Sequence, residues 1–107
     1  MAISAAEIGF ATDLFAGLGA ITTRRMMGGL CLYHDGTIFV LLHPEHGILL
    51  KGAGDFIDRL EAMGCTRWTY AREGKAPVAM PYWTLPDSAQ DDPAEAVALA
   101  REALRHL

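Results

Sequence analysis

The apolar run IFVLL at residues 38–42 constrains the fold of this 107-residue chain more than any other stretch. A strand tolerates apolar side chains at every position only when both of its faces are covered, so this run is expected to form the central strand of a sheet. The dipeptide Asp35-Gly36 separates it from a second apolar run at residues 30–33. Because Asp-Gly between hydrophobic runs is a strong hairpin signal, the sequence predicts that the sheet is built around these two strands.

Helices are predicted before, between and after the strands. Ser4 and Glu7 have the spacing of a capping box, in which each side chain satisfies a free backbone N–H of the other residue, so a helix is expected from about residue 5. A second helix is expected after Asp55, and Gly64 is placed to end it. A third helix is expected from about residue 91, because Pro suits the first turn. Its predicted buried stripe consists of Val97, Ala100, Leu104 and Leu107.

Three further strands are predicted at residues 48–51, 68–72 and 78–85. Pro81 cannot donate to a strand ladder, so the last strand is expected at an edge or with a bulge. The stretch before Gly28-Gly29 is extended in character, and the glycine pair offers a bend. The predicted order is α-β-β-β-α-β-β-α. Short turns favour a mainly antiparallel five-stranded sheet with helices packed on one face, which is a two-layer α+β sandwich formed as one domain over residues 1–107.

The composition disfavours several classes of protein. The longest apolar run is about five residues, far short of a membrane span, and the N-terminus lacks the pattern of a signal peptide, so we expect a cytoplasmic protein without membrane contact. Nine basic residues stand against thirteen acidic ones, and the pI is about 5.4. Because the two signs are interleaved along the chain, we expect no direct nucleic-acid binding. Cys31 and Cys65 are too few for a secreted disulfide framework and are expected as buried free thiols.

The most distinctive candidate for a partner-binding site is a cationic pair followed by two flexible thioethers and two glycines. These residues are Arg24, Arg25, Met26, Met27, Gly28 and Gly29. Methionines re-pack readily against partners. In the alternative interpretation, one arginine pairs with an acidic neighbour and the methionines fill the core. Consecutive strand residues face opposite sides, so at most one Arg and one Met can face a given partner.

Aromatic residues near the strands form a second candidate, a ligand pocket. They are Tyr33, Tyr70, Tyr82 and Trp83. The alternative is that these side chains pack against the helices, as aromatic residues do in most small cores. The histidines of the pattern His43-x-x-His46 suggest a metal site, but a turn exposes histidines without such a role and no second ligand pair follows. We therefore expect no metal, no cofactor and no catalytic residue.

Several short motifs resemble the TfoX N-terminal domain family. The first is Arg24-Arg25-Met26-Met27-Gly28-Gly29, followed by Leu32-Tyr33 and Asp35-Gly36. Further pieces follow in the same order: Leu49-x-Lys51, Gly64-Cys65, Tyr70 with Gly74-Lys75, and Met80-x-Tyr82-Trp83-x-x-Pro86. Together they cover nearly the whole chain. Two departures stand out, because Met27 replaces a usual aromatic residue and Pro81 occupies a position where Ser is common.

The resemblance implies a sandwich like that of secretion chaperones and a function as a non-enzymatic regulatory or protein-interaction module. Longer members of the family regulate DNA uptake and competence and carry a C-terminal domain that this chain is expected to lack. The partner implied is another protein. The alternative is a small-molecule-binding protein or minor enzyme that uses the aromatic pocket. A homodimer is also expected, because three helices are too few to cover both faces of a five-stranded sheet.

Overall fold

The structure is a computed structural model that describes residues 3–26 and 28–107. Its helices are α1 (Ala5–Leu14), α2 (Phe56–Ala62), α3 (Asp87–Gln90) and α4 (Pro93–Leu104), with a short 3-10 helix at Ala16–Leu18. Its strands are β1 (Thr22–Met26), β2 (Gly29–His34), β3 (Thr37–His43), β4 (Gly47–Lys51), β5 (Arg67–Arg72) and β6 (Lys75–Thr84). All pairings are antiparallel, in the spatial order β1-β2-β3-β4-β6-β5.

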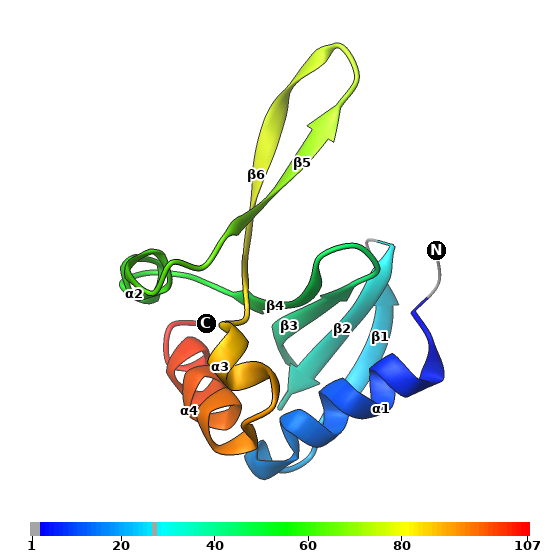
Figure 1. Cartoon of the computed structure of the whole chain (residues 1–107), viewed down its shortest axis with the longest axis vertical. Coiled ribbons are helices and arrows are strands. Elements are labelled where there is room, and N and C mark those ends of the chain that lie inside the picture. The colour runs from blue at the N-terminus through cyan, green and yellow to red at the C-terminus, as the bar shows by residue number, and fades with distance from the viewer. Residues whose placement is uncertain (1–2, 27) are drawn as a thin grey trace.

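The predicted two-layer α+β architecture is confirmed, with the helices gathered on one side of the sheet (Figure 1). The described part of the chain has six strands, however, and the sequence predicted five. The additional strand is β1, which pairs with β2 over its whole length, from Thr22 opposite Tyr33 to Met26 opposite Gly29. The stretch looked extended in the sequence, and its β-branched threonines suit an edge strand. α3 is a second unpredicted element, a single turn just before α4.

The larger core lies between the sheet and the helices. The inward side chains of β2, β3 and β4 meet side chains from all four α-helices there. The register of β2 against β3 shifts, since Leu32 pairs with Val40 and Tyr33 with Ile38. Phe39 is therefore the extra residue of a β-bulge, and both Phe39 and Val40 face the helices. The ring of Phe39 meets Phe15 edge to face, with centroids 5.4 Å apart.

Two of the three predicted helix starts take the predicted form. The Ser4 hydroxyl accepts from the Glu7 N–H at 3.1 Å, and Glu7 accepts from the Ser4 N–H at 3.2 Å, which is the predicted capping box. At α4, the Asp92 carboxylate accepts from the N–H groups of Ala94 and Glu95. Asp55 precedes α2, but its side chain makes no capping hydrogen bond.

The predicted buried stripe of α4 is rotated relative to the observed one. The buried residues are Ala96, Leu99, Ala100 and Ala103. Val97 and Leu104 are only half-buried, and Leu107 is exposed. Three of the four buried residues are alanines, which let the helix backbone come close to its neighbours and leave the larger apolar side chains at the margins of the contact.

The β5–β6 hairpin rises from the sheet on the side away from the helices and extends along the long axis of the molecule (Figure 1). The principal extents are 42 × 32 × 26 Å. We call residues 68–81 of this hairpin the arm, and the sheet face opposite the helices the outer face. β6 pairs with β4 only from Tyr82 to Thr84, which leaves the rest of its length to the arm.

Candidate functional site

The outer face carries a second apolar cluster in which the base of the hairpin packs on the sheet. Cys31, Leu41 and Leu49 point outward from β2, β3 and β4 and are completely buried. Trp68 and Tyr82 cover them, with exposed fractions of 9% and 3%. This cluster explains why the run at residues 38–42 is apolar throughout, because one side packs on the helices and the other lies beneath the hairpin.

A cleft of about 630 Å³ opens between the arm and the turn that joins β3 to β4. The turn contributes His43, Glu45 and His46 to its wall. The arm contributes Trp68, Thr69, Tyr70, Ala71 and Met80. Its volume is in the range of small-molecule and side-chain pockets, and its wall combines aromatic rings with a few polar groups.

Three aromatic rings form the inner wall of the cleft. The His43 ring lies 4.6 Å from the His46 ring and 5.0 Å from the Trp68 ring, measured between centroids. Trp68 continues the contact to Tyr82 at 6.3 Å. Such tilted ring pairs contribute favourable electrostatics beyond their buried area. The wall is therefore a preformed surface for planar or apolar groups.

His43 also holds the β3–β4 turn together. Its Nδ1 accepts hydrogen bonds from the backbone N–H groups of Glu45 and His46, at 3.0 and 3.3 Å. A ring nitrogen that accepts cannot carry a proton, so these bonds require the neutral tautomer protonated at Nε2. Burial lowers the pKa of His43, the neighbouring His46 lowers it further, and Glu45 opposes the shift.

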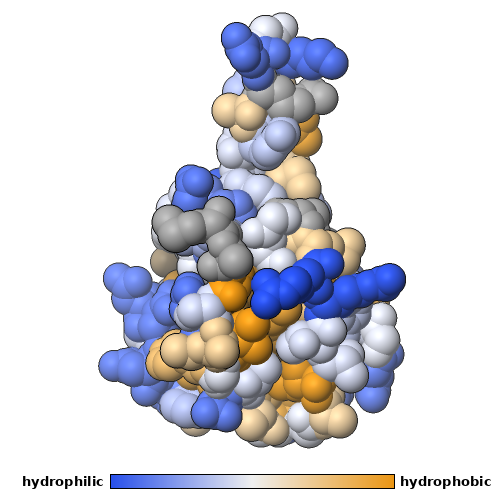
Figure 2. Space-filling view, turned by 90° about the vertical axis from the view of Figure 1, so that its right-hand side faces the viewer, coloured by the Kyte–Doolittle hydropathy of each residue, from blue (hydrophilic) through white to orange (hydrophobic). Residues whose placement is uncertain are grey.

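The arm carries exposed apolar side chains beyond the cleft. Tyr70 and Val78 are paired across the two strands, and 51% and 38% of their surfaces are exposed. Contiguous exposed apolar side chains mark interaction sites when the patch is large, and this pair adjoins the aromatic wall of the cleft. In Figure 2 the arm projects above the body of the domain, on which hydrophobic residues are bordered by strongly hydrophilic ones.

The candidate partner residues lie along the exposed edge strand β1 and the turn after it. Arg24 is paired with Cys31 and therefore shares the outer face, whereas Arg25 is paired with Leu30 of the helix-side core and points the other way. Met26 accepts a hydrogen bond from the Tyr33 hydroxyl through its sulfur, at 3.2 Å. Gly28 lies in the turn before β2, Gly29 is the first residue of β2, and Met27 lies outside the described residues.

The four candidate pocket aromatics are divided between the two faces of the sheet. Tyr33 and Tyr82 belong to the outer cluster, and Tyr70 lines the cleft beside it. Trp83 is fully buried in the helix-side core, where its indole N–H donates to Glu61 at 3.1 Å. The remaining residues of the cleft wall include His43, His46 and Trp68. The sequence did not predict that these residues meet, because 22 positions separate His46 from Trp68. The alternation of aromatic residues at 68–72 was the one feature of the sequence that could have pointed to this wall.

Metal-binding groups and reactive thiols were the remaining candidates for chemistry in the described chain. Within residues 3–26 and 28–107, no group of three or more His, Cys, Asp and Glu side chains is arranged to hold a metal ion. Burial raises the pKa of both thiols, Cys31 and Cys65, and so disfavours the reactive thiolate. Across the same residues, the structure contains no helix with the length and hydropathy required to cross a membrane.

The fold and the site thus define a small α+β domain with an apolar, aromatic outer surface and a projecting hairpin. The sequence model of the TfoX N-terminal domain matches residues 13–107, and the chain belongs to that family. It is also similar to the DNA transformation protein TfoX1 of Aliivibrio fischeri (strain ATCC 700601 / ES114), with 26% identity over 90 residues. The similarity covers 83% of this chain and 42% of that protein, so the chain spans about two fifths of the relative's length.

Proposed function

We propose that this domain is a non-enzymatic regulatory module that binds a partner protein through the arm and the outer face. The observation that carries the proposal is the exposed pair Tyr70 and Val78 on a hairpin that projects from the body beside a preformed cleft. Aromatic side chains next to pockets are the residues that most often dominate binding energy at protein interfaces. The similarity to a DNA transformation protein supports a role related to competence.

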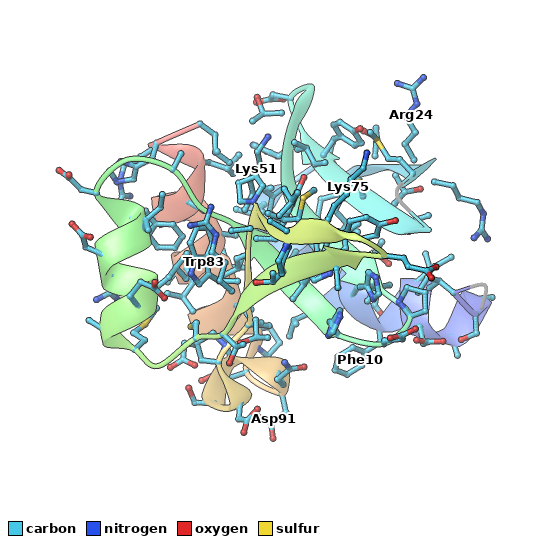
Figure 3. All side chains as sticks on the ribbon, turned by 90° about the horizontal axis from the view of Figure 1, so that it is seen from above. Phe10, Arg24, Lys51, Lys75, Trp83 and Asp91 are labelled. Carbon is cyan, nitrogen blue, oxygen red and sulfur yellow. The ribbon has the colours of Figure 1, made fainter. Side chains whose placement is uncertain are left out.

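Affinity capture from a native lysate, with two matched surface variants, tests this function. The arm variant changes Tyr70→Ser and Val78→Ser together, and the control changes Phe10→Ser, which removes an apolar side chain that is 53% exposed on α1. Phe10 lies on the opposite side of the arm from Arg24, Lys51 and Lys75 (Figure 3). We expect the arm variant to lose proteins that the wild type and the Phe10 variant retain. Equal capture by all three proteins would contradict the proposal.

The cleft supports a second candidate function, the binding of a small planar molecule. Its volume of about 630 Å³ and the neighbouring rings of His43, His46 and Trp68 favour this alternative. A ligand there would quench or shift the fluorescence of Trp68, while Trp83 lies in the other core. A metabolite panel screened by fluorescence and melting temperature tests it, because a ligand that binds the folded state raises Tm.

We also propose that the domain self-associates through a sheet edge. A dimer was expected from the sequence partly because both faces of the strand at residues 37–42 are apolar, but its outward-facing Leu41 is buried within one copy beneath the hairpin. The edge strand β1 is exposed along its whole length and offers unpaired backbone groups. Light scattering at about 100 µM should detect such a dimer even when it is weak. A monomer alone at that concentration would contradict self-association.

A further inference from the structure

The fold separates charges that are interleaved in the sequence. The segments that build the sheet, residues 20–51 and 65–85, contain six basic and three acidic residues. The segments that build the helical layer, residues 3–19, 52–64 and 86–107, contain three basic and ten acidic residues. The basic residues of the sheet layer are Arg24, Arg25, Lys51, Arg67, Arg72 and Lys75. A net-negative protein therefore has one basic layer, and this layer is the one without helices.

Three of these cations lie around the outer face and the arm. Arg24 shares the outer face with its pair Cys31, and Lys51 follows the outward-facing Leu49 by two positions in β4. Lys75 lies at the tip of the arm, where it pairs with residue 72. Seen from above, Arg24, Lys51 and Lys75 lie on the same side of the arm, with Phe10 and Asp91 on the other (Figure 3). The three acidic residues of the sheet layer, Asp35, Glu45 and Glu73, are confined to turns.

Exposed apolar side chains accompany these cations on the sheet edge and on the arm. Met26 is 40% exposed at the β1 edge, and Tyr33 is half-buried next to it, joined through the hydroxyl-to-sulfur hydrogen bond. On the arm, Val78 and Tyr70 are exposed, and Met80 is half-buried between the outer cluster and the cleft. The outer face and the arm thus carry both exposed apolar side chains and cations. Protein interfaces commonly combine apolar contacts with charged groups.

We propose that the outer face and the arm bind an acidic protein segment that carries apolar side chains, a ligand class that specifies the partner in the proposed function and rests on it. The cations attract carboxylates, and the apolar side chains of Met26 and Tyr33 on the sheet and of Val78 on the arm contact the apolar side chains of the segment. The charge of the surface selects the occupant. A second copy presenting its own outer face would bring like charges together, and such juxtaposition is costly at an interface.

An acidic protein segment fits these groups better than a nucleic acid. A protein that gains useful affinity from phosphates makes about six to ten cationic contacts, whereas three cations lie on the outer face and the arm. Tyr70 is exposed and could stack on one base, but Met26 and Val78 offer no ring for further bases. Leucine and phenylalanine side chains between carboxylates match both parts of the surface.

The test uses the full chain and a short fluorescein-labelled peptide in which Glu alternates with Leu and Phe, followed by fluorescence anisotropy. A matched peptide has Gln in place of Glu, and a single-stranded oligonucleotide is the competing ligand. The variants are Lys51→Glu and Arg24→Glu, with Arg105→Glu on the helical layer as a control of equal charge change. If a charge reversal unfolds the protein, the measurement is made with Lys51→Gln and Arg24→Gln instead.

We expect the acidic peptide to bind at least about tenfold more tightly than the Gln peptide at about 50 mM salt, and the difference to shrink at higher salt. Each outer-face substitution should weaken binding about fivefold, and Arg105→Glu by less than twofold. Equal binding of the two peptides, absence of peptide binding, or tighter oligonucleotide binding that depends on Lys51 and Arg24 would overturn the proposal. If lysate capture requires Tyr70 and Val78 but survives the reversal of both cations, this inference fails and the proposed function stands.

Discussion

The guanidinium carbon of Arg67 lies 4.5 Å from the centroid of the Trp83 ring, at the point where the arm leaves the sheet. The same guanidinium donates through Nε to the backbone carbonyl of Met80 at 2.8 Å. Trp83 is fixed on its other side by the hydrogen bond to Glu61 of α2. Arg67 therefore connects the base of the hairpin to the helix-side core, although the arm itself projects away from that core (Figure 1).

Replacement of Arg67 should loosen the base of the arm. We expect Arg67→Ala to lower the unfolding free energy by about 1 kcal/mol, since a cation–π contact and a hydrogen bond to an exposed arginine are both lost. Arg67→Lys should recover less than half, because an ammonium group lacks the planar Nε donor. Urea unfolding followed by tryptophan fluorescence measures both values. An Arg67→Ala protein as stable as the wild type would show that the contact contributes nothing.

Gly29 should be the more sensitive glycine of the motif before β2. A Cβ on Gly29 would overlap the backbone carbonyl oxygen of Leu42 on the neighbouring strand, and a carbonyl in a strand ladder cannot move aside as a side chain can. We expect Gly29→Ala to cost about 2–3 kcal/mol, as other cases of overpacking do. Gly9→Ala is the matched control, because nothing lies within 4 Å of the added carbon. This helix substitution should stabilise the protein by up to about 1 kcal/mol.

Thermal unfolding of the two glycine variants at equal concentration checks this prediction. We expect Gly9→Ala to have the highest melting temperature, the wild type an intermediate one and Gly29→Ala the lowest. A Gly29→Ala protein that melts with the wild type would mean that β2 and β3 can separate at this point without loss of pairing.

Acid should weaken the β3–β4 turn through His43. The pKa of His43 is lower in the folded protein than its ordinary value of 6.5, so the unfolded chain takes up the proton more readily. The stability that the neutral ring contributes is therefore fully present above the ordinary pKa of 6.5, and it is lost as the pH falls through the lower pKa of the folded protein. Protonation also removes the Nδ1 acceptor of the Glu45 and His46 N–H groups.

We expect the melting temperature of the wild type to fall more steeply between about pH 7 and pH 5 than that of His43→Asn. An Asn side-chain oxygen can accept the same turn hydrogen bonds without titrating. His106→Asn, near the end of the chain on the helical side, serves as the control and should follow the wild type. Parallel pH profiles for the wild type and His43→Asn would show that His43 does not cause the loss of stability in acid.

Both thiols should be unreactive in the folded protein. Cys31 is buried in the outer cluster and Cys65 in the helix-side core, so the sheet lies between them. Burial raises the pKa of each thiol; Lys51 partly offsets the effect at Cys31, and Glu61 reinforces it at Cys65. Iodoacetamide without reductant should add almost nothing to the native protein and two groups after unfolding. An intact bridge between the two cysteines in the mass spectrum would contradict the separation of the cores.

Local patterns were sufficient to predict most of the fold. The capping box at Ser4, the Asp35-Gly36 turn and the apolar alternation of the strands each act over a few residues, and the structure contains all three. The stripe of α4 was misjudged, because its orientation depends on how closely alanines approach the sheet and not on the size of its apolar residues. The bulge at Phe39 was also missed, since an apolar run gives no sign of which residue breaks the alternation.

The candidate site was less predictable because it depends on long-range placement. The histidines of the β3–β4 turn meet Trp68 only because the hairpin crosses the outer face. The basic character of the sheet layer is also invisible in sequence order, where cationic strands alternate with acidic helices. The placement of Arg24 on the outer face follows from strand alternation, but its neighbours on that face required the register of four strands.

The most direct test of the central proposal is a photocrosslinking amino acid placed at Tyr70 in cells, with the same residue at Ala98 on the exposed side of α4 as the control. The arm is proposed to contact a partner protein, so Tyr70 should give discrete protein adducts that Ala98 does not give. Irradiation that yields no protein adduct at Tyr70, or the same adducts at both positions, would contradict the assignment of the arm as the binding surface.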